Sequence, residues 1–168
     1  MELVYTPTRD DVVDAMRVRL RYGSIRWLLR LLPVCAVLIL LLAALEVFGP
    51  GGPHLGSALR NAGFGLLFLA LGPLLTRAAA GQMYPVIQRQ GEHRARVDGD
   101  GVRWVTRESE VVGRWTLMSR YAETPTQFVL LSADKPGVGM GALPKRGLAD
   151  PADIDRLRAL LDSNATRL

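Results

Sequence analysis

The sequence has one cysteine and two lysines among its 168 residues. Because Cys35 has no second cysteine to pair with, an intramolecular disulfide and a cysteine cluster for a metal ion are both excluded. Of the 21 basic residues only Lys135 and Lys145 are lysines, so guanidinium groups supply most of the positive charge. A formal net charge of +5 does not by itself indicate nucleic-acid binding, and we expect no nucleic-acid partner.

Aromatic residues are also few, at 7% of a chain that is 49% hydrophobic. The apolar excess is mainly leucine, alanine and valine, and it is concentrated in two blocks, 27–48 and 62–80. As helices these blocks would be about 33 Å and about 28 Å long, close to the roughly 30 Å thickness of bilayer hydrocarbon. The rest of the chain is too short to wrap two such helices, so the sequence predicts two membrane spans.

The segment between the blocks contains Gly49-Pro50-Gly51-Gly52-Pro53, which favours a short turn between antiparallel helices. Arginines gather where the two blocks meet the rest of the chain: Arg17, Arg19, Arg21, Arg26, Arg30, Arg77, Arg89, Arg94 and Arg96. The connecting segment has only Arg60. By the positive-inside rule, this asymmetry predicts a hairpin whose two chain ends both lie on the cytoplasmic side.

Residues 1–26 are expected to form a short strand and then an amphipathic helix beside the membrane. Leu3 and Tyr5 are apolar residues two positions apart, which is a short strand signal, and Thr8 resembles an N-cap with Asp11 three residues on. The apolar side of this helix is predicted from the spacing of Val12, Val13, Met16 and Leu20.

Residues 81–168 have the pattern of a β-rich domain that ends in a helix. Strands are predicted at 93–97, 102–106, 111–117, 121–123 and 127–132, and a turn at 98–101. The glycine-rich segment between Ser132 and Leu143 is less favourable for a strand. Asp150-Pro151 opens a helix that has Leu157 and Leu161 on its apolar face, and Trp115 lies on the apolar side of its strand.

This layout resembles that of the YcxB-like bacterial membrane proteins, whose C-terminal domain is similar to pleckstrin-homology (PH) domains. The residues that carry the resemblance are Glu108-Ser109, Trp115, Met118, Tyr121, Glu123-Thr124, Phe128 to Leu131 and Leu143-Pro144-Lys145-Arg146. The resemblance implies an α+β membrane protein: a two-helix transmembrane hairpin and a small PH-like β-barrel or half-barrel capped by a C-terminal helix. It also implies the bacterial plasma membrane as the location and does not imply an enzyme.

Residues with catalytic chemistry are sparse. His54 and His93 are separated by the second predicted span, so they are not expected to share a catalytic or metal site. We therefore expect no enzymatic activity, no metal and no cofactor. The candidate ligand-binding residues are basic and lie in the cytoplasmic domain: Arg114, Arg120, Lys135, Lys145 and Arg146.

Three functions are compatible with this pattern. The first is a membrane-tethered interaction or scaffolding module, which binds an unknown protein partner or forms a homo-oligomer. The second is recognition of anionic lipid by the basic residues, since guanidinium and ammonium groups bind lipid phosphates. The third is an accessory subunit of a membrane transporter, in which the hairpin would contact another membrane protein.

Overall fold

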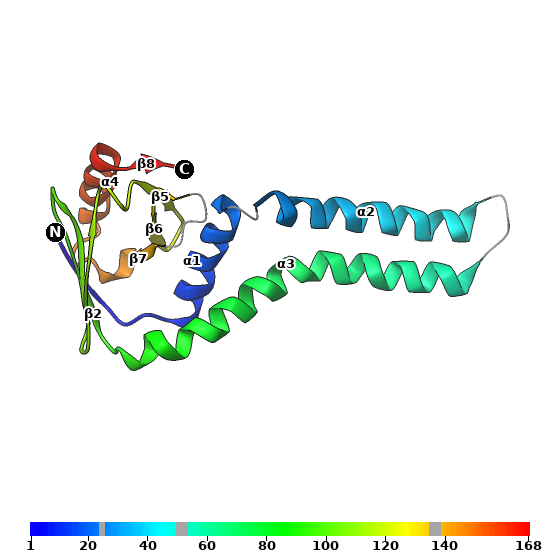
Figure 1. Cartoon of the computed structure of the whole chain (residues 1–168), viewed down its shortest axis with the longest axis horizontal. Helices are drawn as coiled ribbons and strands as arrows, with labels where there is room; N and C mark the ends of the chain where they lie inside the picture. The colour runs from blue at the N-terminus through cyan, green and yellow to red at the C-terminus, as the bar shows by residue number, and fades with distance from the viewer. Residues whose placement is uncertain (24–25, 50–53, 135–138) are drawn as a thin grey trace. The chain divides into compact units, whose positions relative to one another are not determined.

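The computed structural model describes residues 1–23, 26–49, 54–134 and 139–168 (Figure 1). The chain is an α+β protein that divides into two compact units. The hairpin unit comprises residues 25–78, and the sheet unit combines residues 1–24 with residues 79–168. The N-terminal segment, expected to stand apart from the domain at 81–168, therefore folds together with it.

The hairpin unit consists of α2 (Arg26–Phe48) and the first part of α3 (Leu55–Arg89). A Cβ atom at Gly65 would lie 2.6 Å from the Leu40 side chain, so the small residue allows the two helices to approach. Nearer the connection, Asn61 Nδ2 donates to both carboxylate oxygens of Glu46 at 3.1 and 3.2 Å. Both helices are long and apolar enough to cross a membrane by length and composition.

Eight strands of the sheet unit form two four-stranded sheets. Sheet A has the order β1 (Glu2–Tyr5), β2 (His93–Val97), β3 (Gly101–Val105) and β4 (Glu110–Arg114). Sheet B has the order β7 (Met140–Pro144), β6 (Gln127–Leu131), β5 (Arg120–Glu123) and β8 (Thr166–Arg167). Over the described ranges the strands make two four-stranded sheets and no closed barrel, which corrects the closed-barrel form of the expected barrel or half-barrel.

Strand β1 precedes the hairpin unit in the chain but belongs to the same sheet as strands that follow it. It pairs with β2 in the antiparallel direction, and Tyr5 lies opposite His93. The rings of these two residues stack with their centroids 5.7 Å apart. A strand at the beginning of the chain is thus an integral part of a sheet whose other strands all follow α3.

Helix α1 (Arg9–Tyr22) packs on sheet B. Its Ala15 and Val18 join a buried apolar cluster with Val129 and Leu131 of β6. The expected burial of Val12 and Met16 is confirmed, but Val13 and Leu20 are only half-buried. The apolar face of α1 is therefore covered by protein.

The remaining core lies between the sheets and helix α4 (Asp153–Asn164). Leu157 and Leu161 of α4 are fully buried in it, as their spacing predicted. Trp104 and Trp115 are buried in the same cluster. At Gly141 of β7, a Cβ atom would lie 2.3 Å from the ring of Trp104, so the glycine makes room for the indole.

Candidate functional site

The adjacent candidate residues Lys145 and Arg146 each bind a different carboxylate of the sheet unit. They lie in the short 3₁₀ helix η1 (Lys145–Gly147) that follows β7. Lys145 Nζ donates to Glu123 Oε1 at 2.7 Å and to the carbonyl of Thr124 at 2.9 Å. Arg146 donates through both terminal nitrogens to the Asp11 carboxylate, at 2.6 Å for Nη1 and Oδ1, and also reaches the carbonyl of Thr6.

The Asp11 carboxylate is positioned by the start of α1. Thr8 is the N-cap of this helix, and its backbone N–H donates to Asp11 Oδ2 at 2.7 Å in a capping box. Burial by itself would raise the pKa of Asp11, but the hydrogen bonds from Arg146 and Thr8 outweigh it and hold the pKa below its ordinary value. The Asp11–Arg146 pair therefore ties α1 to the end of β7.

Glu123 is the centre of a second cluster of charges. Arg158 of α4 donates to its carboxylate through Nε at 2.9 Å and through Nη2 at 2.8 Å, and Arg167 of β8 donates at 2.9 Å. Hydrogen bonds from Arg158 and Lys145 lower the pKa of Glu123 to about 2 against the opposing effect of burial. The cations of Lys145 and Arg158 also lie 5.1 and 6.0 Å from the centre of the Phe128 ring.

Of the other three candidate basic residues, the two that the structure describes, Arg114 and Arg120, do not join the charge clusters around Asp11 and Glu123. Arg120 donates to the carbonyls of Ser132 and Asp134, at 3.2 Å from Nε and 2.7 Å from Nη2 respectively. Lys135 lies outside the described residues. Arg114 lies on β4 with an exposed side chain and, within the part of the chain that the structure describes, has no acidic partner within 4 Å.

These positions bear on the lipid-binding hypothesis. A carboxylate that accepts hydrogen bonds from a cation offsets much of its charge, so the cation attracts a phosphate less strongly. Lys145 and Arg146 are both engaged in this way, and the Lys145 side chain is only 17% exposed. The geometry therefore gives these two residues a role in holding α1, α4 and β5 to the end of β7.

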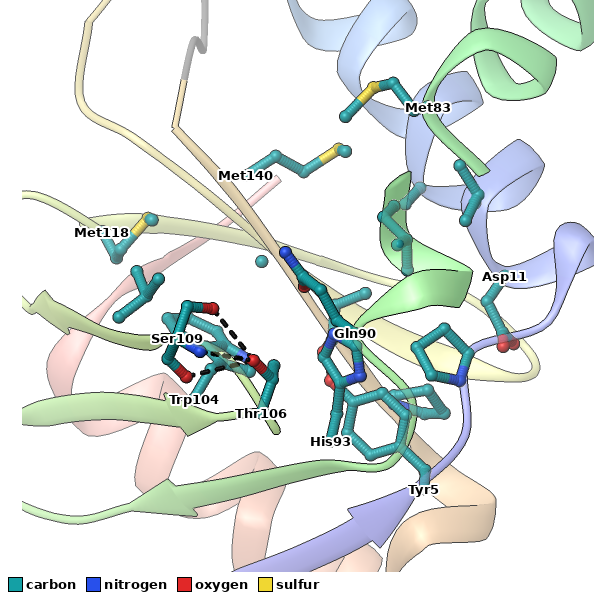
Figure 2. Close-up of a pocket in the computed structure, with 18 residues that line it drawn as sticks. Tyr5, Asp11, Met83, Gln90, His93, Trp104, Thr106, Ser109, Met118 and Met140 are labelled. Carbon is teal, nitrogen blue, oxygen red and sulfur yellow. Dashed lines mark hydrogen bonds between the residues drawn. The ribbon is translucent and has the colours of Figure 1, made fainter. Parts of the chain in front are cut away.

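The sheet unit also contains a cavity of about 290 Å³ (Figure 2). Its polar wall includes the stacked rings of Tyr5 and His93, and the Tyr5 hydroxyl donates to the carbonyl of Ala142 at 2.7 Å. Burial is the main cause that raises the pKa of this hydroxyl. The apolar wall consists largely of side chains from α1, the end of α3 and both sheets, namely Val12, Ala15, Met83, Ile87, Trp104, Val111, Met118 and Met140.

The lining of this cavity suits an uncharged group. Among the described lining residues, Asp11 is the one aspartate, glutamate, lysine or arginine, and its carboxylate is paired with Arg146. Three methionines adapt to occupants of different shape because their side chains are flexible and polarisable. Among the residues described, no three histidine, cysteine, aspartate or glutamate side chains gather into a metal-binding group.

Sequence reasoning did not anticipate this cavity. Its lining comes from strands that are distant in sequence, from the segments that connect them, and from α1 and the end of α3, which precede and follow residues 25–78 in the chain. Such a set has no spacing that a linear pattern can reveal. The one local signal at this place is Thr8 with Asp11, which predicts a helix cap and no cavity.

Comparison of the chain with protein-family models gave no match. Neither the curated proteins nor the solved structures contain a significant match to it.

Proposed function

We propose that the protein is a membrane-tethered PH-like interaction module, held at the cytoplasmic face of a bacterial plasma membrane by a two-helix hairpin. Its sheet unit binds a protein partner or a second copy of the chain. The proposal also places the chain among the YcxB-like membrane proteins. It includes no enzymatic step, metal or cofactor.

The exposed apolar surface of the hairpin unit carries this proposal. Leu38 and Leu41 of α2 are 56% and 55% exposed in the single chain, and Phe64 and Leu66 of α3 are 50% and 61% exposed. A helix of a soluble core would bury such side chains. α2 has 23 residues and is therefore about 34 Å long, enough to cross the roughly 30 Å hydrocarbon layer with its backbone amides satisfied internally.

The PH-like assignment is supported by the order of elements in the sheet unit. Strands β2, β3 and β4 are consecutive antiparallel neighbours, as are β5, β6 and β7. A C-terminal helix, α4, then contributes Leu157 and Leu161 to the core. An interaction role is further supported by the concave, mostly apolar cavity, which is a common feature of binding sites.

Alkaline extraction of membranes tests the anchoring. We expect the full chain to stay with the membranes, and reporters placed after Gly52 and after Leu168 to lie in opposite compartments. Replacing both Leu38 and Leu41 with arginine should release the protein or prevent its insertion, because each charge at a helix centre costs about 3 kcal/mol. The matched control is Val105→Arg, at a 40% exposed position of sheet A, which should remain membrane-bound. A wild-type chain found in the soluble fraction would refute the proposal.

A further inference from the structure

Strand β4 is an open edge of sheet A. It pairs only with β3, and the backbone of residues 110–113 makes no other hydrogen bond in the described part of the chain. The edge has neither proline nor lysine, and its two valines, Val111 and Val112, are 52% and 51% exposed. An exposed apolar edge with unused backbone donors and acceptors is suited to pairing with another strand.

The sequence of β4 is complementary to itself. It reads Glu-Val-Val-Gly-Arg, so two copies that run antiparallel and are centred on Val112 place each Glu110 opposite the Arg114 of the other copy. In the described ranges of the single chain Arg114 has no acidic partner, and the Glu110 carboxylate is ion-paired with the exposed Arg103. Opposite charges on facing residues stabilise an antiparallel pair.

The side chains of the two faces are also compatible with this register. On the outer face Val112 would lie opposite Val112 of the second copy. On the inner face Val111 would lie opposite Gly113 of the second copy, where the glycine adds no side chain of its own. Gly113 is fixed as a small residue by its neighbours, because a Cβ atom there would lie 2.9 Å from Met118 and 3.1 Å from Trp104.

From these observations we infer that two copies of the chain associate by antiparallel pairing of β4 with β4, which joins their two A sheets into one continuous sheet. The contact is isologous, since the same five residues meet on both sides of a two-fold axis. This inference rests on the proposed function, for which it names the partner as a second copy. Confinement of both copies to one membrane raises their effective concentration and favours the pairing.

Crosslinking of the full chain in native membranes tests the register. In a Cys35→Ala background, Val112→Cys should give a disulfide-linked dimer on mild oxidation, because facing Cα atoms of an antiparallel pair are about 4.5–5.5 Å apart. Val105→Cys is the matched control: it is exposed on the same face but belongs to β3, so its two copies would be more than about 14 Å apart. Equal crosslinking of the two variants, or none at Val112→Cys, would overturn the inference.

Exchange of the charges of Glu110 and Arg114 tests whether these two residues face each other across the dimer. Added to the Val112→Cys chain, Glu110→Arg or Arg114→Glu should each weaken dimerisation about tenfold, because facing charges become alike at two symmetric places. The double exchange should restore dimerisation, since it reinstates both opposite-charge pairs. A double variant that stays as monomeric as the single variants would overturn the register, provided that its tryptophan fluorescence shows a folded sheet unit.

The membrane extraction described above separates this inference from the proposed function. A chain that remains in the membrane but gives no Val112→Cys dimer contradicts only the β4 pairing. A chain that forms this dimer but is soluble without detergent contradicts the membrane anchoring and leaves the pairing supported.

Discussion

Removing the charge of Glu123 should destabilise the sheet unit, and its effect can be derived from the contacts of this carboxylate. The side chain is 11% exposed and accepts hydrogen bonds from Lys145, Arg158 and Arg167. A pKa held at about 2, compared with an ordinary 4.5, corresponds to about 3 kcal/mol at most. Because Arg158 and Arg167 are partly exposed, solvent screening reduces the expected contribution to about 1–2 kcal/mol.

Glu123→Gln keeps the size of the side chain and removes its charge. For a domain of this size, the expected loss of about 1–2 kcal/mol corresponds to a fall in melting temperature on the order of 5 °C. The assay is thermal unfolding of the full chain in detergent at pH 7, followed by the fluorescence of Trp104 and Trp115 in a Trp27→Phe background. The control is Glu92→Gln, which removes an exposed partner of Arg94 and should shift the melting temperature very little.

The dependence on pH provides a second, independent readout of the same interaction. Because the pKa of Glu123 is lower in the folded protein than in the unfolded chain, its contribution is complete above about pH 4.5 and is lost as the pH falls toward about 2. The difference in melting temperature between wild type and Glu123→Gln should therefore shrink over this interval. If the difference stays constant, or if Glu123→Gln behaves like Glu92→Gln at pH 7, the assigned role of the carboxylate is wrong.

Two further substitutions test the packing and the second ion pair. Gly141→Ala should destabilise the sheet unit by about 1–3 kcal/mol because its Cβ would enter the ring of Trp104, whereas Gly99→Ala, where no atom lies within 4 Å of a Cβ, should stay within about 0.5 kcal/mol in the same thermal assay. Asp11→Asn removes the negative charge and one of the two acceptor oxygens that bind Arg146, and it weakens the cap of α1. Hydrogen exchange measured by mass spectrometry should therefore become about tenfold or more faster in α1, with no change in the hairpin helices.

Local patterns in the sequence predicted most individual elements of the sheet unit. The alternation of His93 to Val97 and the turn at 98–101 correspond to β2 and the connection to β3. Thr8 forms the expected cap, and the spacing of Leu157 and Leu161 identified the buried face of α4. These features are decided by interactions within a few residues, which is why a linear pattern contains them.

The strand predicted across 111–117 shows where this reasoning fails. β4 ends at Arg114, and the following residues turn, with the N–H groups of Leu117 and Met118 both donating to the carbonyl of Arg114. In the glycine-rich segment, which is less favourable for a strand, β7 forms at Met140–Pro144 and includes Gly141. There, the close packing of Trp104 on Gly141 requires a residue that strand propensity disfavours.

For the candidate site, too, the sequence predicted some residues and only the structure showed their partners. The sequence identified Lys145 and Arg146 as notable cations, but their partners, Glu123 and Asp11, are distant in the chain and meet them only through the pairing of β5, β6 and β7 and the packing of α1. It did not show that β1 would join β2 across the inserted hairpin.

What the sequence alone determined is the segregation of apolar residues into two long helices, together with the short-range signals for strands, turns and caps. What only the tertiary structure decided is which charges are neutralised, which side chains enclose the cavity, and which strand edge stays open. The physical reason is that hydropathy and capping depend on neighbours in the chain, whereas ion pairing, burial and edge exposure depend on contacts made across it.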